Sequence, residues 1–208
     1  MPADETLHRS WQAAWHALGA APPASLQAEL LAAYGEAQRH YHARQHLGEC
    51  LALFDTHAAE AERPAEVALA LWFHDAVYDV QAHDNEARSA DWAREALRAA
   101  GADAAAAQRV HALVMATRHD ALPQGRDAQL LVDIDLAILG AAPARFAEYE
   151  RQIRAEYAHV PPEVFEPRRR GILGRFLARD PLYLTPAIRA AREAQARINL
   201  RAAIGAGG

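Results

Sequence analysis

Residues 67–75 read VALALWFHD, and this stretch decides the fold class. Every position from Val67 to Phe73 is apolar, which is typical of a helix buried on all sides rather than of a surface helix. Pro64 stands where a proline starts a helix, so we expect a helix from there to about Asp75. A helix of this kind must be surrounded by other elements, and the rest of the chain favours helices for that role.

Composition favours helices along the whole chain. Alanine, the strongest helix former, fills 52 of the 208 positions, whereas valine, isoleucine and threonine together number only 19. We therefore predict an all-α protein, a single bundle of about nine helices over residues 1–204 with a flexible tail at 205–208. Besides the buried helix, the later helices are expected at about residues 41–57, 84–101, 103–118, 127–139, 143–158, 162–178 and 186–203.

Charge and composition exclude several classes of function. All 22 basic residues are arginine, which excludes Schiff-base catalysis and a lysine-dependent P-loop. The net charge of −5 disfavours a polymeric nucleic acid as partner. The run from Val67 to Phe73 is too short to span a bilayer, and residues 1–5 lack the features of a signal peptide. The single Cys50 cannot form an internal disulfide. We expect a cytoplasmic protein without a membrane partner.

An imidazole and a carboxylate, His74 and Asp75, stand at the end of the buried helix. An ionised carboxylate in such a place is costly unless it is paired, hydrogen-bonded or bound to a metal. In an isolated pair, the histidine more often bonds a backbone carbonyl and the aspartate caps a turn. This pair is not isolated, because further histidines and acids interrupt apolar sequence elsewhere.

Two of the three histidines on the predicted helix at 41–57 lie one turn apart near its start. His46 shares an arc with the apolar residues around Cys50 and therefore points inward, and His42 lies one turn earlier near the same face. A zinc protease needs glutamate directly after the first histidine of such a pair. That position is Ala43, which excludes a metalloprotease.

Asp133 and Asp135 interrupt the apolar segment 130–139. At about 100° per residue they lie about 200° apart around a helix, so we expect only one of them to reach a given metal ion. Asp135 falls inside the apolar stripe that contains Leu131 and Ile138, whereas Asp133 falls on the opposite side. We expect Asp133 to bond a neighbouring helix or a backbone amide. Two imidazoles and two carboxylates would then form a mixed ligand set, suited to Mn, Fe, Co, Ni or Zn and tolerant of Mg.

With their flanking residues, these positions resemble the HD superfamily of metal-dependent phosphohydrolases, whose minimal signature is H…HD…D. The chain is most similar to a branch of predicted HD phosphohydrolases of comparable length. The matching blocks, in order, are residues 41–47, 72–79, 84–90, 116–119, 133–140, 153–157 and 196–200.

The resemblance implies an HD-type helical bundle that binds one divalent metal ion (Mn, Co, Ni, Fe, Zn or Mg). It implies hydrolysis of a small phosphorylated metabolite, a phosphomonoester or a nucleotide, by a metal-activated water. Some members bind two metals, but this chain has Arg118 where a histidine pair with His119 would be expected. The ligands implied by the resemblance are His46, His74, Asp75 and Asp135.

Two other functions remain open from the sequence. One is a diiron oxygenase on the same scaffold, with His42 and His119 helping to hold a second metal. The other is a non-catalytic module that binds a nucleotide, although such a module does not need an intact set of metal ligands.

Phosphoryl transfer also requires proton transfer and neutralisation of the phosphate oxygens. Beside Asp75, the candidate acid–base groups are Glu86, Asp79 and His119. An acid at the start of a helix, such as Glu86, is also favoured by the helix dipole alone, and His119 can serve the carbonyls at a helix end. The candidate substrate-binding groups are Arg154 and His42. The run at 168–170 is interpreted as a solvated arginine face.

Overall fold

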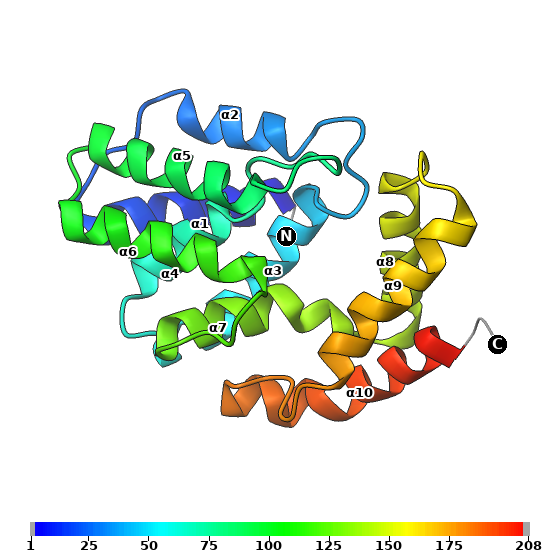
Figure 1. The fold of residues 1–208 in the computed structure, drawn as a ribbon. Helices are drawn as coiled ribbons and strands as arrows, with labels where there is room; N and C mark the ends of the chain where they lie inside the picture. The colour runs from blue at the N-terminus through cyan, green and yellow to red at the C-terminus, as the bar shows by residue number, and fades with distance from the viewer. Residues whose placement is uncertain (1–2, 206–208) are drawn as a thin grey trace. The chain divides into compact units, whose positions relative to one another are not determined.

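In the computed structural model, residues 3–205 are described, and they form ten α-helices and three short 3-10 segments (Figure 1). No strand occurs among these residues, so the prediction of an all-α fold is confirmed. None of the described helices is both long and apolar enough to cross a bilayer. The elements are α1 (Ala3–Leu18), α2 (Leu26–Ala33), α3 (Arg44–His57), η1 (Ala58–Glu60), α4 (Pro64–Phe73), α5 (Asn85–Ala99), α6 (Ala104–Met115), η2 (Ala116–Arg118), α7 (Arg126–Asp135), η3 (Leu136–Gly140), α8 (Pro143–Glu156), α9 (Pro162–Leu177) and α10 (Pro186–Gly205).

The chain forms two compact units, one ending at Val132 and the other beginning at Asp133. A single domain over residues 1–204 stays a prediction. Of the predicted tail, Gly205 is the last residue of α10, and residues 206–208 lie outside the described residues.

Helix α4 is the centre of the first unit. It packs against α1, α3, α5 and α6, and every residue from Glu66 to Phe73 is buried (Figure 1). Trp72 is fully buried, with its ring centroid 5.0 Å from that of Trp11 on α1. Glu66, the one acid inside this helix, accepts two hydrogen bonds from Arg109 on α6, at 2.8 and 2.6 Å. The prediction of a helix buried on all sides is confirmed, because four helices cover it.

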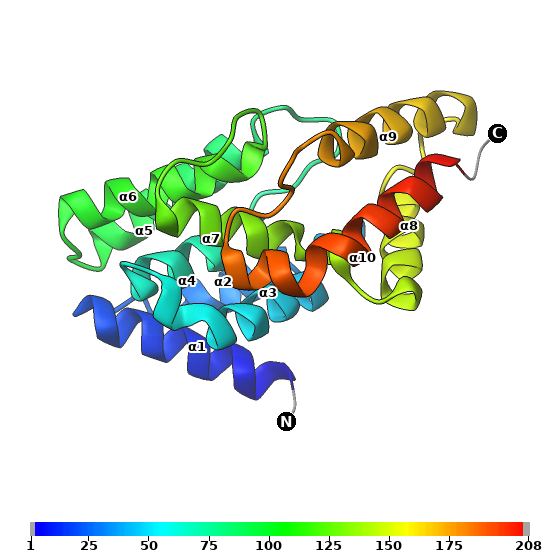
Figure 2. The same cartoon turned by 90° about the horizontal axis from the view of Figure 1, so that it is seen from below.

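The second unit is built on η3, which packs against α8 and α10, while α10 also packs against α9 (Figure 2). Asn199 on α10 donates to the carbonyls of Leu139 and Ala141, both at 2.9 Å. A Cβ on Gly140 would stand 2.7 Å from the carbonyl oxygen of Arg192, so only glycine permits this close approach of α10.

Predicted and observed helix boundaries differ at several places, and two of the differences concern predicted metal ligands or their neighbours. The helix predicted at 41–57 begins at Arg44, because Ala43 is extended (φ −121°, ψ −177°) and the N–H of Arg44 bonds the carbonyl of Tyr34 at 3.2 Å. The helix predicted at 127–139 is α-helical only to Asp135 and continues as the 3-10 segment η3.

Candidate metal centre

Three side chains of the first unit converge on one point. His46 lies in the first turn of α3, and His74 and Asp75 directly follow α4. The Nε2 atoms of His46 and His74 are 3.1 Å apart. Asp75 Oδ2 lies 3.5 Å from the first and 3.1 Å from the second. Both imidazoles are buried, with 2% and 1% of their surface exposed for His46 and His74.

This triangle has the size of a metal-ligand set. Ligand atoms about 2.1 Å from an ion and about 90–110° apart lie roughly 3.0–3.4 Å from one another. The observed edges of 3.1, 3.5 and 3.1 Å correspond to that spacing. Asp75 Oδ2 is itself buried and accepts no hydrogen bond from any described residue, because its approach to His74 lacks hydrogen-bond geometry. A buried carboxylate oxygen without a donor is costly, and a cation at this point would satisfy it.

The tautomer of His74 also suits a metal ligand. Its Nδ1 lies 2.7 Å from the carbonyl oxygen of Leu71, which can only accept, so Nδ1 carries the proton. The lone pair of Nε2 is therefore directed at the cluster. A second ring nitrogen fixed by a backbone carbonyl is the usual arrangement of a metal-binding histidine.

Electrostatics keep Asp75 ionised. Burial alone raises the pKa of its carboxyl, but electrostatic attraction to the imidazoles of His74, His42 and His46 outweighs burial. The pKa of Asp75 consequently lies well below its usual range, and the group is an anionic ligand at neutral pH.

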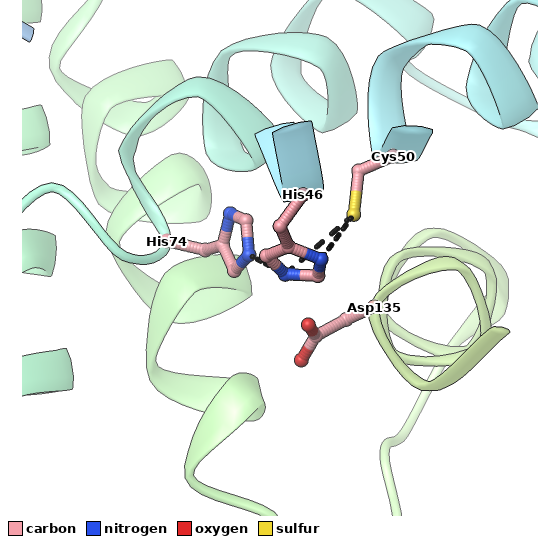
Figure 3. Close-up of side chains that lie close together, drawn as sticks. All are labelled: His46, Cys50, His74 and Asp135. Atoms are coloured by element: carbon pink, nitrogen blue, oxygen red, sulfur yellow. Dashed lines mark hydrogen bonds between the residues drawn. The ribbon is translucent and has the colours of Figure 1, made fainter. Parts of the chain in front are cut away.

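Cys50 adds a sulfur donor. It follows His46 by one turn on α3, and its Sγ lies 3.6 Å from His46 Nδ1 and 3.8 Å from His46 Nε2. One donor atom each from His46, Cys50 and His74 lies within 4.8 Å of the others, so the group can hold a metal ion. Figure 3 shows His46 and His74 facing each other, with Cys50 beside the His46 ring; the Asp135 drawn there belongs to the second unit. The sequence placed Cys50 on the inward face only as a packing residue.

The prediction that His42 lies on a helix is wrong, because His42 lies in the turn before α3. The reason is the extended Ala43, which separates it from the helix that carries His46. Its ring is stacked on that of Tyr78, with centroids 4.1 Å apart, and its centroid is 6.2 Å from that of His46. His42 therefore lies beside the cluster, but its position is set by the turn before α3 and not by a shared helix face.

The other acid–base candidates lie on separate elements of the first unit. Asp79 is exposed, and its Oδ1 accepts the N–H of Gln81 at 2.9 Å in a tight turn. Glu86 is half-buried in the first turn of α5. His119 follows η2 in the left-handed conformation (φ 57°) and is half-buried. Their catalytic roles stay predictions.

The predicted arginines of the second unit are held by protein groups. Arg154 donates to the carbonyls of Tyr157 and Val160, at 2.5 and 3.0 Å, and its guanidinium lies 4.8 Å from the ring centroid of Phe165. These contacts fix the turn after α8, and substrate binding by Arg154 stays a prediction. Arg169 is not part of a solvated face: 12% of its side chain is exposed, and it pairs with Glu150.

The two late aspartates have different environments. Asp133 is buried, with 1% of its surface exposed, because residues on all faces of this part of α7 are buried. Its Oδ2 accepts the N–H of Thr185, which precedes α10, so the expected bond to a backbone amide is confirmed. Burial raises the pKa of Asp133, and this backbone bond opposes the rise. Asp135, the last residue of α7, is half-buried.

Sequence reasoning missed two residues that contact Asp75. Tyr34 and Arg39, from the end of α2 and the segment that follows it, bond the main chain of Asp75 and Ala76. Neither position is marked by a pattern in the sequence, since a tyrosine after a helix and an arginine in a polar segment are both commonplace.

No family model, no curated protein and no solved structure matches this chain.

Proposed function

We propose that this protein is a metal-dependent hydrolase of a small phosphate ester, either a phosphomonoester or a nucleotide. The observation that carries the proposal is the convergence of His46 Nε2, His74 Nε2 and Asp75 Oδ2 at 3.1–3.5 Å. The H…HD…D pattern, in which the same three residues resemble the HD superfamily, supports it independently of the geometry.

The proposed ligand set consists of His46, His74 and Asp75, with Asp135 as the fourth ligand. The first three are supported by their mutual distances, and Asp135 by the sequence resemblance. We expect one divalent ion per chain. The nitrogen and oxygen donors suit Mn, Fe, Co, Ni or Zn, and the neighbouring Cys50 thiol favours the thiophilic members of that group.

When bound, such an ion lowers the pKa of a coordinated water and neutralises charge on the phosphoryl oxygens. The residues of the chain have the remaining tasks. The ionised Asp75 carboxylate accepts the proton that the attacking water loses as its oxygen bonds to phosphorus. His42, beside the cluster and stacked on Tyr78, donates a proton to the departing ester oxygen or hydrogen-bonds a phosphoryl oxygen. Glu86, Asp79 and His119 are the alternative donors.

The direct test is metal analysis of anaerobically purified protein, followed by a screen of phosphorylated metabolites with Mn, Co, Ni and Mg added. We expect about one transition metal ion per chain and metal-dependent phosphate release from at least one compound. A protein that binds none of these ions would contradict the proposal. Iron-dependent oxygen uptake without phosphate release would replace it by the diiron alternative.

The assignment of the fourth ligand has its own test, in which two variants of α7 control each other. Asp135→Asn is expected to lower metal affinity by at least about tenfold, because it removes an anionic donor. Asp133→Asn is expected to leave affinity unchanged and to act on stability only, since its amide oxygen can still accept the N–H of Thr185. Titration calorimetry measures both affinities, and the reverse pattern would exchange the roles of the two aspartates.

A further inference from the structure

The main chain of Asp75 is held on both sides by side chains from the segment between α2 and α3. The N–H of Asp75 donates to Tyr34 Oη at 3.2 Å. Arg39 Nη1 donates to the carbonyl oxygen of Asp75 at 2.5 Å, and Arg39 Nη2 to that of Ala76 at 2.9 Å. The peptide groups before and after the Asp75 Cα are therefore both anchored.

Arg39 is itself immobilised. Only 1% of its side chain is exposed, and its Nε donates to Glu36 at 3.0 Å. The guanidinium carbon lies 5.6 Å from the ring centroid of Tyr34 and 5.7 Å from that of Tyr78. A planar guanidinium with its donors committed and aromatic rings on its faces has a single orientation, which it imposes on the carbonyls that it bonds.

Part of this arrangement serves the fold, because the carbonyls after α4 need donors and a cation is favourable at a helix C-terminus. The location has a second consequence. The anchored residue is the one whose Oδ2 lies 3.1 Å from one imidazole nitrogen and 3.5 Å from another. A shift of its Cα by a few tenths of an ångström moves that oxygen away from the point where the three donors meet.

We propose that Arg39 and Tyr34 are positioning residues, which hold the Asp75 carboxylate in metal-binding geometry through its main chain. The inference rests on the proposed metal site but concerns two residues outside the H…HD…D pattern. It assigns them an effect on metal affinity beyond their effect on stability.

Three variants test this by calorimetric titration with Zn²⁺ and Mn²⁺ at a temperature where each is folded by circular dichroism. Arg39→Met removes both carbonyl bonds and is expected to weaken metal binding about tenfold or more. Arg39→Lys keeps the positive charge but cannot donate to both carbonyls in the geometry of a guanidinium. Its metal affinity should lie between those of Arg39→Met and the wild type. Tyr34→Phe removes only the acceptor for the Asp75 N–H with almost no change in volume, and should weaken binding by a smaller factor.

A matched control is available in the second unit. Arg197 likewise donates to two carbonyls at the end of a helix, those of Leu177 and Arg179 at 3.2 and 2.9 Å. Arg197→Met is expected to lower the melting temperature but to leave metal affinity unchanged. Because Arg39 acts through Asp75, combining Arg39→Met with Asp75→Asn should weaken binding no further than Asp75→Asn alone.

The outcomes separate the two proposals. Wild-type affinity in both Arg39→Met and Tyr34→Phe, or additive losses in the double variant, would overturn the positioning role and leave the metal site standing. No metal binding by the wild-type protein would overturn both. The inference is supported if Arg39→Met and Tyr34→Phe each weaken metal binding, and if Arg39→Met has no further effect on affinity in a protein that already carries Asp75→Asn.

Discussion

Asp75→Asn is expected to abolish phosphate release, with a loss of about a thousandfold or more, and to leave the helical circular-dichroism signal intact. The substitution removes at once an anionic ligand and the group proposed to accept the proton of the attacking water. An amide has nearly the volume of a carboxylate, and the main-chain contacts of Asp75 to Tyr34 and Arg39 do not involve its side chain. Loss of function should therefore occur without loss of fold.

Asp103→Asn is the matched control for this variant. Asp103 is an acid of the same unit whose side chain caps α6 by accepting the N–H of Ala106 at 3.1 Å, and asparagine caps a helix about as well. We expect Asp103→Asn to retain wild-type turnover, measured as phosphate release with the best substrate of the screen. Turnover at the wild-type rate in Asp75→Asn with metal bound would show that the reaction does not use this carboxylate.

Removal of the metal is expected to lower thermal stability strongly. An ion at one hundred times its dissociation constant stabilises the folded state by about 2.7 kcal/mol. For a chain of this size that corresponds to a melting temperature about 5–10 °C higher than that of the chelator-treated protein. Differential scanning calorimetry with and without added Zn²⁺ or Mn²⁺ measures the difference.

Two histidine variants of α3 serve as a comparison for the metal effect. His46→Ala should melt at the same temperature with and without metal, because it removes one of the converging donors. His57→Ala removes a histidine from the same helix, one that pairs with Glu60 at 2.6 Å, and should keep the full metal-dependent rise. A rise of equal size in both variants would show that the stabilising ion binds elsewhere.

The buried helix could be predicted from the sequence because seven consecutive apolar residues, Val67 to Phe73, allow no other placement. The start of α3 could not. Local propensity extends the helix back to Tyr41, but the N–H of Arg44 bonds the carbonyl of Tyr34, a contact that exists only in the folded unit. Tertiary contacts of this kind leave no periodic signal.

The residues of the site also divide into those that the sequence predicted and those that it did not. His46, His74 and Asp75 were predicted because charged or polar groups in apolar sequence need partners, and their distances now agree with a common partner. Arg39 and Tyr34 act on main-chain atoms of another segment, and no side-chain pattern encodes that. The phase argument predicted the bond of Asp133 to a backbone amide. It could not predict that Asp133 is as buried as its neighbours, because phase does not show that all faces of this part of α7 are covered.

The enclosure of α4 by four helices has a kinetic consequence for the residues that follow it. Amide protons of a helix without a solvent-facing side exchange with deuterium only when the surrounding unit opens as a whole. Those of Val67 to Phe73 should therefore be among the slowest in the chain, and fraying at the surface of α1 or α5 should not reach them. His74 and Asp75 are joined directly to this slowest segment. The segment that carries two of the three converging donors should therefore not open locally to release a bound ion to a chelator.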